Sequence, residues 1–254
     1  LTHAHLDHCG LVPDIASRGT PVVSTPVTGA LAERMAQDTL KVAELENYPR
    51  PFHRTAIADM NRNLRPSKPG KIEYRGGFEF QMFNAGHIPG AVMFNFPQQD
   101  FLFTGDIHTV DTQLTRAAKP KPCKTLAIES TYGGRDHPDR GQIESELVDS
   151  IEEVVNSGGK VILPSFGLGR SQELLMLTRN LGFEVWLDGM GRDMARILQK
   201  YPGSIRDVSS MHKSIRQTNF VKHSRQRTAA LNADVIVTTS GMLNGGPVLH
   251  YLSK

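Results

Sequence analysis

Cysteine is scarce in this chain of 254 residues, which has only Cys9 and Cys123. The two cysteines do not form a CxxC pair, so the sequence predicts no disulfide framework, as is typical of proteins in a reducing compartment. Cys9 lies beside several histidines. Because free cysteine is commonly buried, we expect Cys9 to be a small packed side chain and not a metal ligand.

Long apolar runs are also missing, and no stretch approaches the length of a membrane span. No signal-peptide pattern opens the chain, so we expect a cytoplasmic protein with no membrane partner. Lys and Arg number 29 against 26 Asp and Glu, which leaves a net charge of +3. This mildly basic balance permits a polyanionic partner without requiring one.

Acidic residues are absent between Met211 and Ala230, a stretch that contains five basic residues. These are Lys213, Arg216, Lys222, Arg225 and Arg227. A groove that follows a nucleic-acid backbone has this composition. A solvated helix face has it as well, and the sequence alone does not choose between the two.

Histidine, by contrast, is concentrated at the start of the chain, where His3, His5, Asp7 and His8 lie within six residues. On an extended backbone, side chains two positions apart point the same way, so His3 and His5 share one direction. Asp7 and His8 follow a turn and can face a second point. The pattern predicts two metal ions side by side, and imidazole with carboxylate suits zinc, iron or manganese.

Three later positions extend this set. His87 lies in Gly86-His87-Ile88-Pro89-Gly90, where small neighbours let an imidazole approach a crowded centre. Asp106 and Glu129 each follow a short apolar strand, at a position where loops commonly carry chemistry. Alone, each is also compatible with an ordinary turn or cap, but the combination favours a metal site.

These motifs resemble the β-CASP branch of the metallo-β-lactamase superfamily. HxHxDH at residues 3–8 is the signature of the fold, and GHIPGA at 86–91, TGD at 104–106 and ESTYG at 129–133 are similar to later motifs of that branch. The branch includes the nuclease subunit of the mRNA cleavage and polyadenylation factor, with its archaeal and bacterial relatives. The resemblance extends over essentially the whole chain.

The resemblance implies a site with two Zn²⁺ ions. One ion is held by His3, His5 and His87, and the other by Asp7 and His8, while Asp106 bridges them. Asp7, Asp106 and Glu129 are the implied catalytic carboxylates, and Glu129 is expected to support a ligating histidine through hydrogen bonds. A carboxylate bridge is physically reasonable, because two neighbouring dications repel each other strongly.

The fold class implied is α/β, with two parts. Residues 1–125 correspond to a metallo-β-lactamase αββα sandwich, and residues 126–254 to an inserted β-CASP domain. Strands expected at 160–164, 184–187 and 235–239 alternate with helices at 142–156 and 171–181, which predicts a mainly parallel sheet. In the first part we expect helices at 9–18 and 26–46, and in the second part turns at 203–210.

Two glycine-rich stretches follow strands of the second part. In the first, Arg170 and Ser171 open a helix, where a substrate phosphate is favoured and arginine can bind it with two hydrogen bonds. In the second, Ser240 and Gly241 occupy a similar loop that also resembles the family. We expect Arg170, Ser171, Ser240 and Gly241 to contact the substrate, although a capped turn without any ligand explains Arg170 and Ser171 as well.

The function implied is that of a zinc-dependent ribonuclease, which hydrolyses single-stranded RNA by two-metal hydroxide attack during 3′-end processing or maturation. Endonucleolytic cutting is expected, with 5′→3′ exonuclease action as the other mode. Other RNA-processing subunits or a second copy of the chain are the implied protein partners. A small-molecule metallo-hydrolase and a non-catalytic RNA-binding subunit are the alternatives.

The family carries two more histidines beyond its second domain, and no histidine of this sequence has their context. The opening strands of the first domain are missing too. We therefore expect this sequence to be a fragment that is inactive or nearly so by itself.

Overall fold

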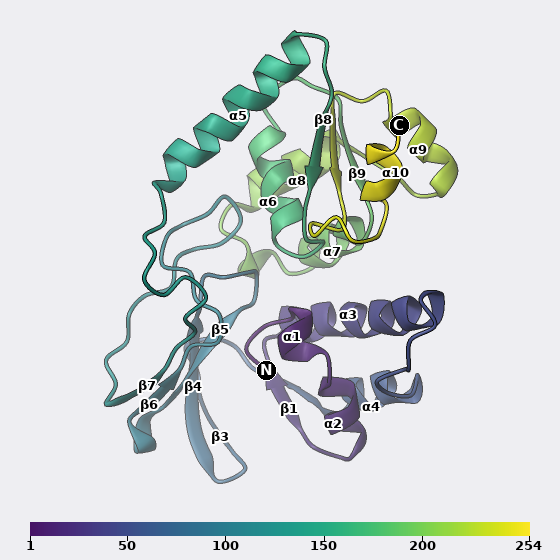
Figure 1. Cartoon of the computed structure of the whole chain (residues 1–254). Helices are drawn as coiled ribbons and strands as arrows, with labels where there is room; N and C mark the ends of the chain where they lie inside the picture. Colours follow the sequence, from purple (N-terminus) through teal and green to yellow (C-terminus); the bar gives the residue numbers. More distant parts are fainter. The chain divides into compact units, whose positions relative to one another are not determined.

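The computed structural model describes residues 1–254 and divides into two compact units (Figure 1). Unit 1 comprises Leu1–Asp111 and Thr115–Thr131, and unit 2 comprises Thr112–Leu114 and Tyr132–Lys254. The domain division expected at residues 125 and 126 stays a prediction. Among the helices, none has both the length and the apolar character needed to cross a membrane.

Unit 1 contains two sheets. Its larger sheet has the order β3-β4-β5-β6-β7, in which the first four strands are antiparallel and β6 pairs with β7 in parallel. Its smaller sheet pairs β1 with β2 in parallel. Buried Phe80, Met82 and Val92 of the larger sheet pack against Val23 of β1, so the two sheets share one core. The strands are β1 (Val22–Ser24), β2 (Leu64–Pro66), β3 (Ile72–Arg75), β4 (Phe78–Asn84), β5 (Val92–Phe96), β6 (Phe101–Phe103) and β7 (Thr125–Ala127).

Four helices belong to unit 1. The longest is α3 (Pro26–Leu45), which begins at the predicted proline and is capped by the Thr25 side chain. The helix predicted at residues 9–18 is wrong as a single element. Two short helices stand there, α1 (Leu6–Cys9) and α2 (Val12–Ser17), because Pro13 favours a first helical turn and has no N–H to continue an earlier one. The fourth helix is α4 (Thr55–Asn63).

Unit 2 is built on a four-stranded sheet in which every pair of neighbours is parallel, with the order β10-β9-β11-β8. The predicted α/β class with a mainly parallel second sheet is therefore confirmed. Strand β10 has only three residues and no apolar run, which is why the sequence did not reveal it. The strands are β8 (Val161–Pro164), β9 (Val185–Asp188), β10 (Thr218–Phe220) and β11 (Val235–Thr238).

Helices cover both faces of this parallel sheet. On one face, Leu187 and Val237 pack with residues of α5 and α6, and on the other, Ile236 packs with residues of α9 and α10. The turns predicted at 203–210 are wrong for the last three residues, since Asp207 caps a helix that begins at Val208. The helices are α5 (Arg140–Asn156), α6 (Arg170–Thr178), α7 (Gly191–Gln199), α8 (Val208–Gln217), α9 (Arg227–Ala230) and α10 (Val248–Leu252).

The buried carboxylate of Asp188 links the short helices α9 and α10 to the end of β9. Asp188 is 3% exposed, and its Oδ2 accepts hydrogen bonds from Arg227 Nε at 2.7 Å and from the Tyr251 hydroxyl at 2.9 Å. Its Oδ1 accepts from the Gly189 N–H at 2.7 Å. One carboxylate thus satisfies donors from the residue after β9, from α9 and from α10.

This arrangement predicts an alkaline limit to the stability of unit 2. Burial raises the pKa of Tyr251 well above its usual value, and the charge of Asp188 raises it further. The stabilisation from this raised pKa is complete below the unfolded-state pKa of about 10, and is lost as the pH rises above it. We expect the free energy of unfolding to fall more steeply between about pH 9 and pH 11 in the wild type than in Tyr251→Phe. Urea titrations at several pH values measure this, and parallel curves would contradict it.

Candidate metal centre

The predicted ligands come from four separate places in unit 1. The backbone is extended at His5 and turns directly afterwards into α1, which carries Asp7 and His8. His87 lies in the loop between β4 and β5, and Asp106 lies three residues after β6. The turn expected after His5 is therefore present.

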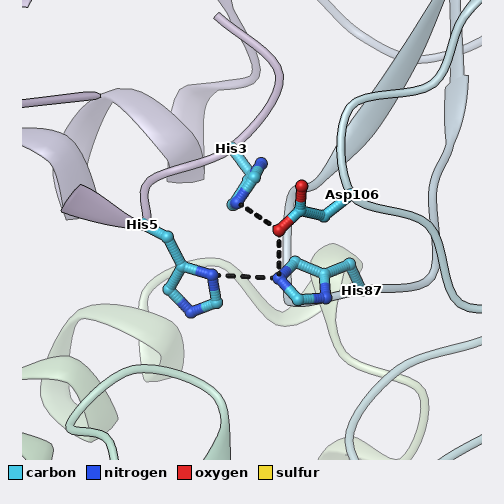
Figure 2. A group of neighbouring side chains, drawn as sticks. All are labelled: His3, His5, His87 and Asp106. Atoms are coloured by element: carbon cyan, nitrogen blue, oxygen red, sulfur yellow. Dashed lines mark hydrogen bonds and ion pairs between the residues drawn. The ribbon is translucent and has the colours of Figure 1, made fainter. Parts of the chain in front are cut away.

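Three imidazoles and one carboxylate meet in the first group (Figure 2). His3, His5, His87 and Asp106 each offer one ligand atom, and these atoms all lie within 4.8 Å of one another. Asp106 Oδ2 is 3.5 Å from His3 Nε2 and 3.4 Å from His87 Nε2. His5 Nδ1 is 2.9 Å from His87 Nε2. Such a convergence of donor atoms is the geometry a metal ion requires.

The other oxygen of Asp106 faces a second group. Asp106 Oδ1 is 3.2 Å from His8 Nε2, and that nitrogen is 3.4 Å from Asp7 Oδ2. The two groups therefore share one carboxylate, with a different oxygen directed at each. This matches the predicted division of the six ligands, although their role as ligands stays a prediction.

The environment keeps two imidazoles of the first group, those of His3 and His87, in the neutral form that binds a metal. Burial, followed by the charges of neighbouring histidines, lowers the pKa of His3 to about 2. Burial likewise lowers the pKa of His87 to about 4, although Glu129 opposes this shift. Both imidazoles are thus neutral at pH 7 and offer a lone pair. Burial raises the pKa of Asp106, with Glu129 and Asp7 adding to the effect and His8 opposing it.

A divalent metal ion fits these residues. His3 Nε2 is buried and has no hydrogen-bond partner, although a buried polar atom normally has one. It points at the other donor atoms of its group, so a metal ion would satisfy it. Nitrogen and carboxylate oxygen form the donor set that zinc accepts.

Thr2 orients His3 and was missed in the sequence. Its side-chain oxygen lies 3.2 Å from His3 Nδ1, the ring nitrogen that points away from the group. When the hydroxyl accepts the Nδ1 proton, Nε2 is left with the lone pair that a metal ligand requires. The only sequence feature that indicates this role of Thr2 is its position, since a polar residue adjacent to a candidate ligand is the first partner to consider.

Glu129 follows β7 and accepts hydrogen bonds from two backbone N–H groups, those of Ile107 at 3.4 Å and Thr131 at 3.1 Å. Burial raises its pKa, but the hydrogen bonds from Thr131 and Ile107 outweigh burial and hold the pKa below its usual value. Ile107 directly follows Asp106. The carboxylate thus holds the backbone next to Asp106, while the expected bond to a histidine stays a prediction.

Cys9 is a packed residue. It is buried, its Sγ lies 3.5 Å from the carbonyl oxygen of Ala4, and burial raises the pKa of its thiol to about 12. A thiol so resistant to ionisation is a poor metal ligand at neutral pH.

The first glycine-rich loop of unit 2 separates Arg170 from Ser171. Arg170 is exposed at the start of α6. Ser171 is fully buried, with its hydroxyl 2.9 Å from Ser165 Oγ and donating to the carbonyl of Phe166 at 2.7 Å. Because a buried hydroxyl with two internal partners has no free surface, the assignment of Ser171 as a substrate contact is corrected to a structural one.

The second glycine-rich loop lies against the first. A Cβ on Gly241 would stand 3.0 Å from the backbone nitrogen of Phe166, so a larger residue would require the backbone to shift by a few tenths of an ångström. The Ser240 hydroxyl lies 3.0 Å from Asn244 Oδ1, within its own loop. Both loops follow carboxyl ends of adjacent parallel strands, where ligands commonly bind in such sheets. Substrate contact by Arg170, Ser240 and Gly241 stays a prediction.

Two of the five basic residues between residues 211 and 230 have side-chain partners within the chain. Lys213 donates to Asn180, and Arg227 is paired with Asp188. Arg216, Lys222 and Arg225 are exposed and lie on or after α8. Both interpretations of this stretch remain open.

Any side chain added at Gly86, directly before His87, is expected to clash with neighbouring backbone atoms. Its φ is +74°, and an added Cβ would stand 2.2 Å from the carbonyl oxygen of His108 and 2.7 Å from the Ala118 nitrogen. Both obstacles are backbone atoms that cannot rotate away. We expect Gly86→Ala to lower the free energy of unfolding by roughly 2–5 kcal/mol, from backbone strain and overpacking together. Urea denaturation measures this, with Gly134→Ala as control, where φ is also positive but nothing lies within 4 Å. Equal losses in the two variants would contradict the steric argument.

Comparison with known proteins identifies relatives along the whole chain. The chain is 33% identical over 268 residues to "Probable RNase MJ4" of Methanocaldococcus jannaschii, covering 99% of this chain and 63% of that protein. It is 34% identical over 264 residues to "RNase aCSPSF2" of Saccharolobus solfataricus, covering 100% and 53%. It is 33% identical over 291 residues to "Transcription termination factor FttA" of Methanococcus maripaludis, covering 100% and 44%.

The chain thus spans between 44% and 63% of the length of these relatives. The family model described as the metallo-beta-lactamase superfamily matches residues 1–165, which include every residue of the candidate metal centre. The motifs, the α/β fold and this match agree. The chain belongs to the metallo-β-lactamase superfamily.

Proposed function

We propose that this chain carries the metal centre of a zinc-dependent nuclease that cuts phosphodiester bonds in single-stranded RNA, by endonucleolytic cleavage. One observation carries the proposal. The two oxygens of Asp106 face different groups of histidines, 3.2 Å from His8 on one side and 3.4–3.5 Å from His87 and His3 on the other. A carboxylate so placed can hold two metal ions close together.

Two zinc ions at this place would polarise the scissile phosphate and lower the pKa of a water molecule toward neutrality. The residues of the chain set the conditions for that chemistry. His3 and His87 supply neutral imidazoles, His5 supplies a third ring nitrogen, and Asp106 supplies the shared negative charge. Asp7 is largely exposed beside His8, so its carboxylate is accessible for a second ion and for a proton from the reaction. Glu129 restrains the backbone that carries Asp106.

The choice of RNA is supported by the relatives, two of which are named as RNases and one as a transcription termination factor. We propose the domain division at residues 125 and 126 on the same basis, with a metallo-β-lactamase part followed by an inserted β-CASP domain. A role in RNA 3′-end processing or maturation, together with other processing subunits or a second copy of the chain, belongs to the same proposal.

The test is an RNA cleavage assay on the intact protein of which this chain is part. End-labelled single-stranded RNA is incubated with wild type, His87→Ala and the matched control His53→Ala, whose exposed histidine lies outside the centre. We expect discrete internal cuts from the wild type and the control, and none from His87→Ala or after chelation. Release of mononucleotides would indicate exonuclease action. Binding without cleavage would indicate a non-catalytic RNA-binding subunit, and neither binding nor cleavage would indicate a small-molecule hydrolase.

A further inference from the structure

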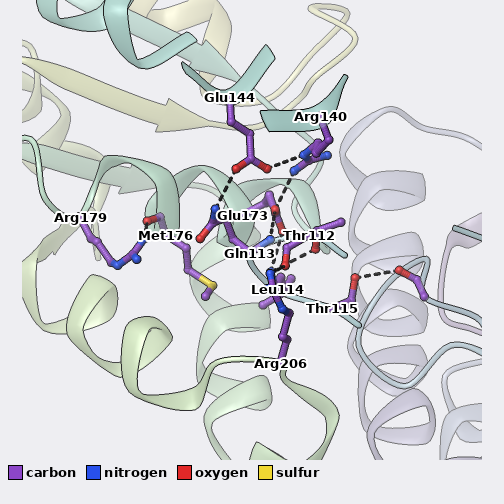
Figure 3. A network of polar contacts seen from close by, with 11 residues as sticks. Thr112, Gln113, Leu114, Thr115, Arg140, Glu144, Glu173, Met176, Arg179 and Arg206 are labelled. Atoms are coloured by element: carbon purple, nitrogen blue, oxygen red, sulfur yellow. Dashed lines mark hydrogen bonds and ion pairs between the residues drawn. The ribbon is translucent and has the colours of Figure 1, made fainter. Parts of the chain in front are cut away.

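A three-residue segment departs from its sequence neighbours. Thr112–Leu114 belongs to unit 2, whereas the residues before and after it, up to Asp111 and from Thr115, belong to unit 1 (Figure 3). The Leu114 side chain in this segment is fully buried. Specific contacts assign this short segment to unit 2.

Glu173 supplies these contacts through both of its carboxylate oxygens. Oε1 accepts the backbone N–H of Gln113 at 2.7 Å, and Oε2 accepts the backbone N–H of Leu114 at 3.0 Å. Glu173 is 4% exposed, and its charge is balanced by Arg140, whose Nη2 donates to Oε1 at 2.7 Å. A buried carboxylate that accepts two consecutive N–H groups defines the path of the backbone at that point.

Further hydrogen bonds hold the segment Thr112–Leu114 in place. Arg206 donates from Nη1 to the carbonyl of Thr112 at 2.5 Å, and its own backbone N–H donates to the carbonyl of Leu114 at 2.8 Å. The Gln113 side chain donates to Glu144 at 2.8 Å, and Glu144 also accepts from Arg140. Four of these hydrogen bonds are therefore made by the backbone of the segment, and one is made by the Gln113 side chain.

Thr115, the next residue along the chain, contacts the turn that carries His87. Buried Thr115 donates from its hydroxyl to the carbonyl of Gly86 at 2.7 Å, and Gly86 directly precedes His87. Two further bonds lie in the same place, since the His108 N–H donates to Ala85 and the Ala118 N–H donates to His108, each at 2.8 Å. The loop after Asp106 thus forms the support on which the His87 turn rests.

We infer that Glu173 is a positioning residue for the metal centre, acting on His87 through the segment Thr112–Leu114 and Thr115. The inference rests on the proposed function, because it assumes that His87 binds a metal ion. The residue lies 67 positions after Asp106 in the sequence, and its carboxylate binds Gln113, Leu114 and Arg140 rather than a proposed ligand. Its effect on the centre is carried by these hydrogen bonds to backbone amides and by the bond from the Thr115 hydroxyl to Gly86.

Two matched variants of the intact protein test this. Glu173→Gln removes the charge and places an amide N–H₂ against backbone N–H groups, whereas Arg140→Gln breaks the same ion pair but leaves both oxygens of Glu173 for the amides of Gln113 and Leu114. Binding of Co²⁺ is followed by visible absorption, and backbone hydrogen exchange is followed by mass spectrometry in the absence of metal. Circular dichroism confirms that each variant is folded.

We expect Glu173→Gln to bind Co²⁺ at least about tenfold more weakly than wild type, as do variants that lose a partner of a ligand. We also expect faster exchange in the peptide containing residues 84–91. Arg140→Gln should resemble wild type in both measurements. Unchanged exchange in Glu173→Gln, or equal changes in the two variants, would overturn the inference. Failure of the wild type itself to bind Co²⁺ would overturn the proposed function instead, and the exchange result would still decide whether Glu173 holds the His87 turn.

Discussion

Replacing Asp106 with asparagine is expected to abolish the metal centre, with RNA cleavage by the intact protein reduced by well over about 100-fold. Loss of a residue that merely supports a ligand costs roughly 10–100-fold in affinity or activity, so loss of a shared ligand costs more. Asparagine keeps the size of the side chain but removes its negative charge. His3 and His87 would then have lost the anionic oxygen that both face, and His8 would keep only that of Asp7.

Metal content separates this result from simple unfolding. Elemental analysis of the purified intact protein should fall from about two ions per chain, the number proposed for such a site, to at most about one in Asp106→Asn. Circular dichroism should remain unchanged, because Asp106 is partly exposed and asparagine has nearly the same size and shape. The matched control is Asp136→Asn, an exposed aspartate outside the centre, which should behave as wild type. Full metal content and full cleavage in Asp106→Asn would refute the bridging role.

The second large effect is expected in unit 2, where Asp188→Ala should lower the free energy of unfolding by about 3–5 kcal/mol. Arg227 is 30% exposed, so the loss arises mainly from the missing acceptor, at about 1–3 kcal/mol for each buried donor left unsatisfied. In this case Arg227, the Tyr251 hydroxyl and the Gly189 N–H all lose their acceptor together. The packing of α9 and α10 against the sheet depends on these bonds.

Urea denaturation measures the loss, and Asp149→Ala serves as its control. Asp149 is an exposed aspartate on α5, so its removal should change the free energy of unfolding by less than about 0.5 kcal/mol. Tyr251→Phe should fall between the two, because it removes a single neutral donor. A loss below about 1 kcal/mol in Asp188→Ala would show that the three donors find other partners.

The metal centre was predictable to an unusual degree because its chemistry is local. His3, His5 and His8 are brought together by short sequence spacing, and an extended backbone followed by a turn sends them in two directions. His87 and Asp106 are distant in sequence, and small neighbours or a strand end marked them. The Thr2 partner of His3 was not visible, since a threonine carries no signal by itself.

Secondary structure was predictable where apolar residues were periodic and helix signals were strong. The helix from Pro26 and the strands β8, β9 and β11 follow from such patterns. The short elements β2, β10 and α10 have three to five residues, too few to show a period. They form because a neighbouring strand or a core residue stabilises them, which is a tertiary effect.

The sequence alone therefore indicated the candidate ligands, the α/β class and the family, because each depends on residue types at short spacing. Only the tertiary structure decided which oxygen of Asp106 faces which histidines, and that Ser171 is buried while Arg170 is exposed. It also decided the role of Glu173, whose partners are backbone amides of Gln113 and Leu114 some 60 residues earlier. Every residue but proline has such an amide, so nothing in a sequence marks the ones that a buried carboxylate will bind.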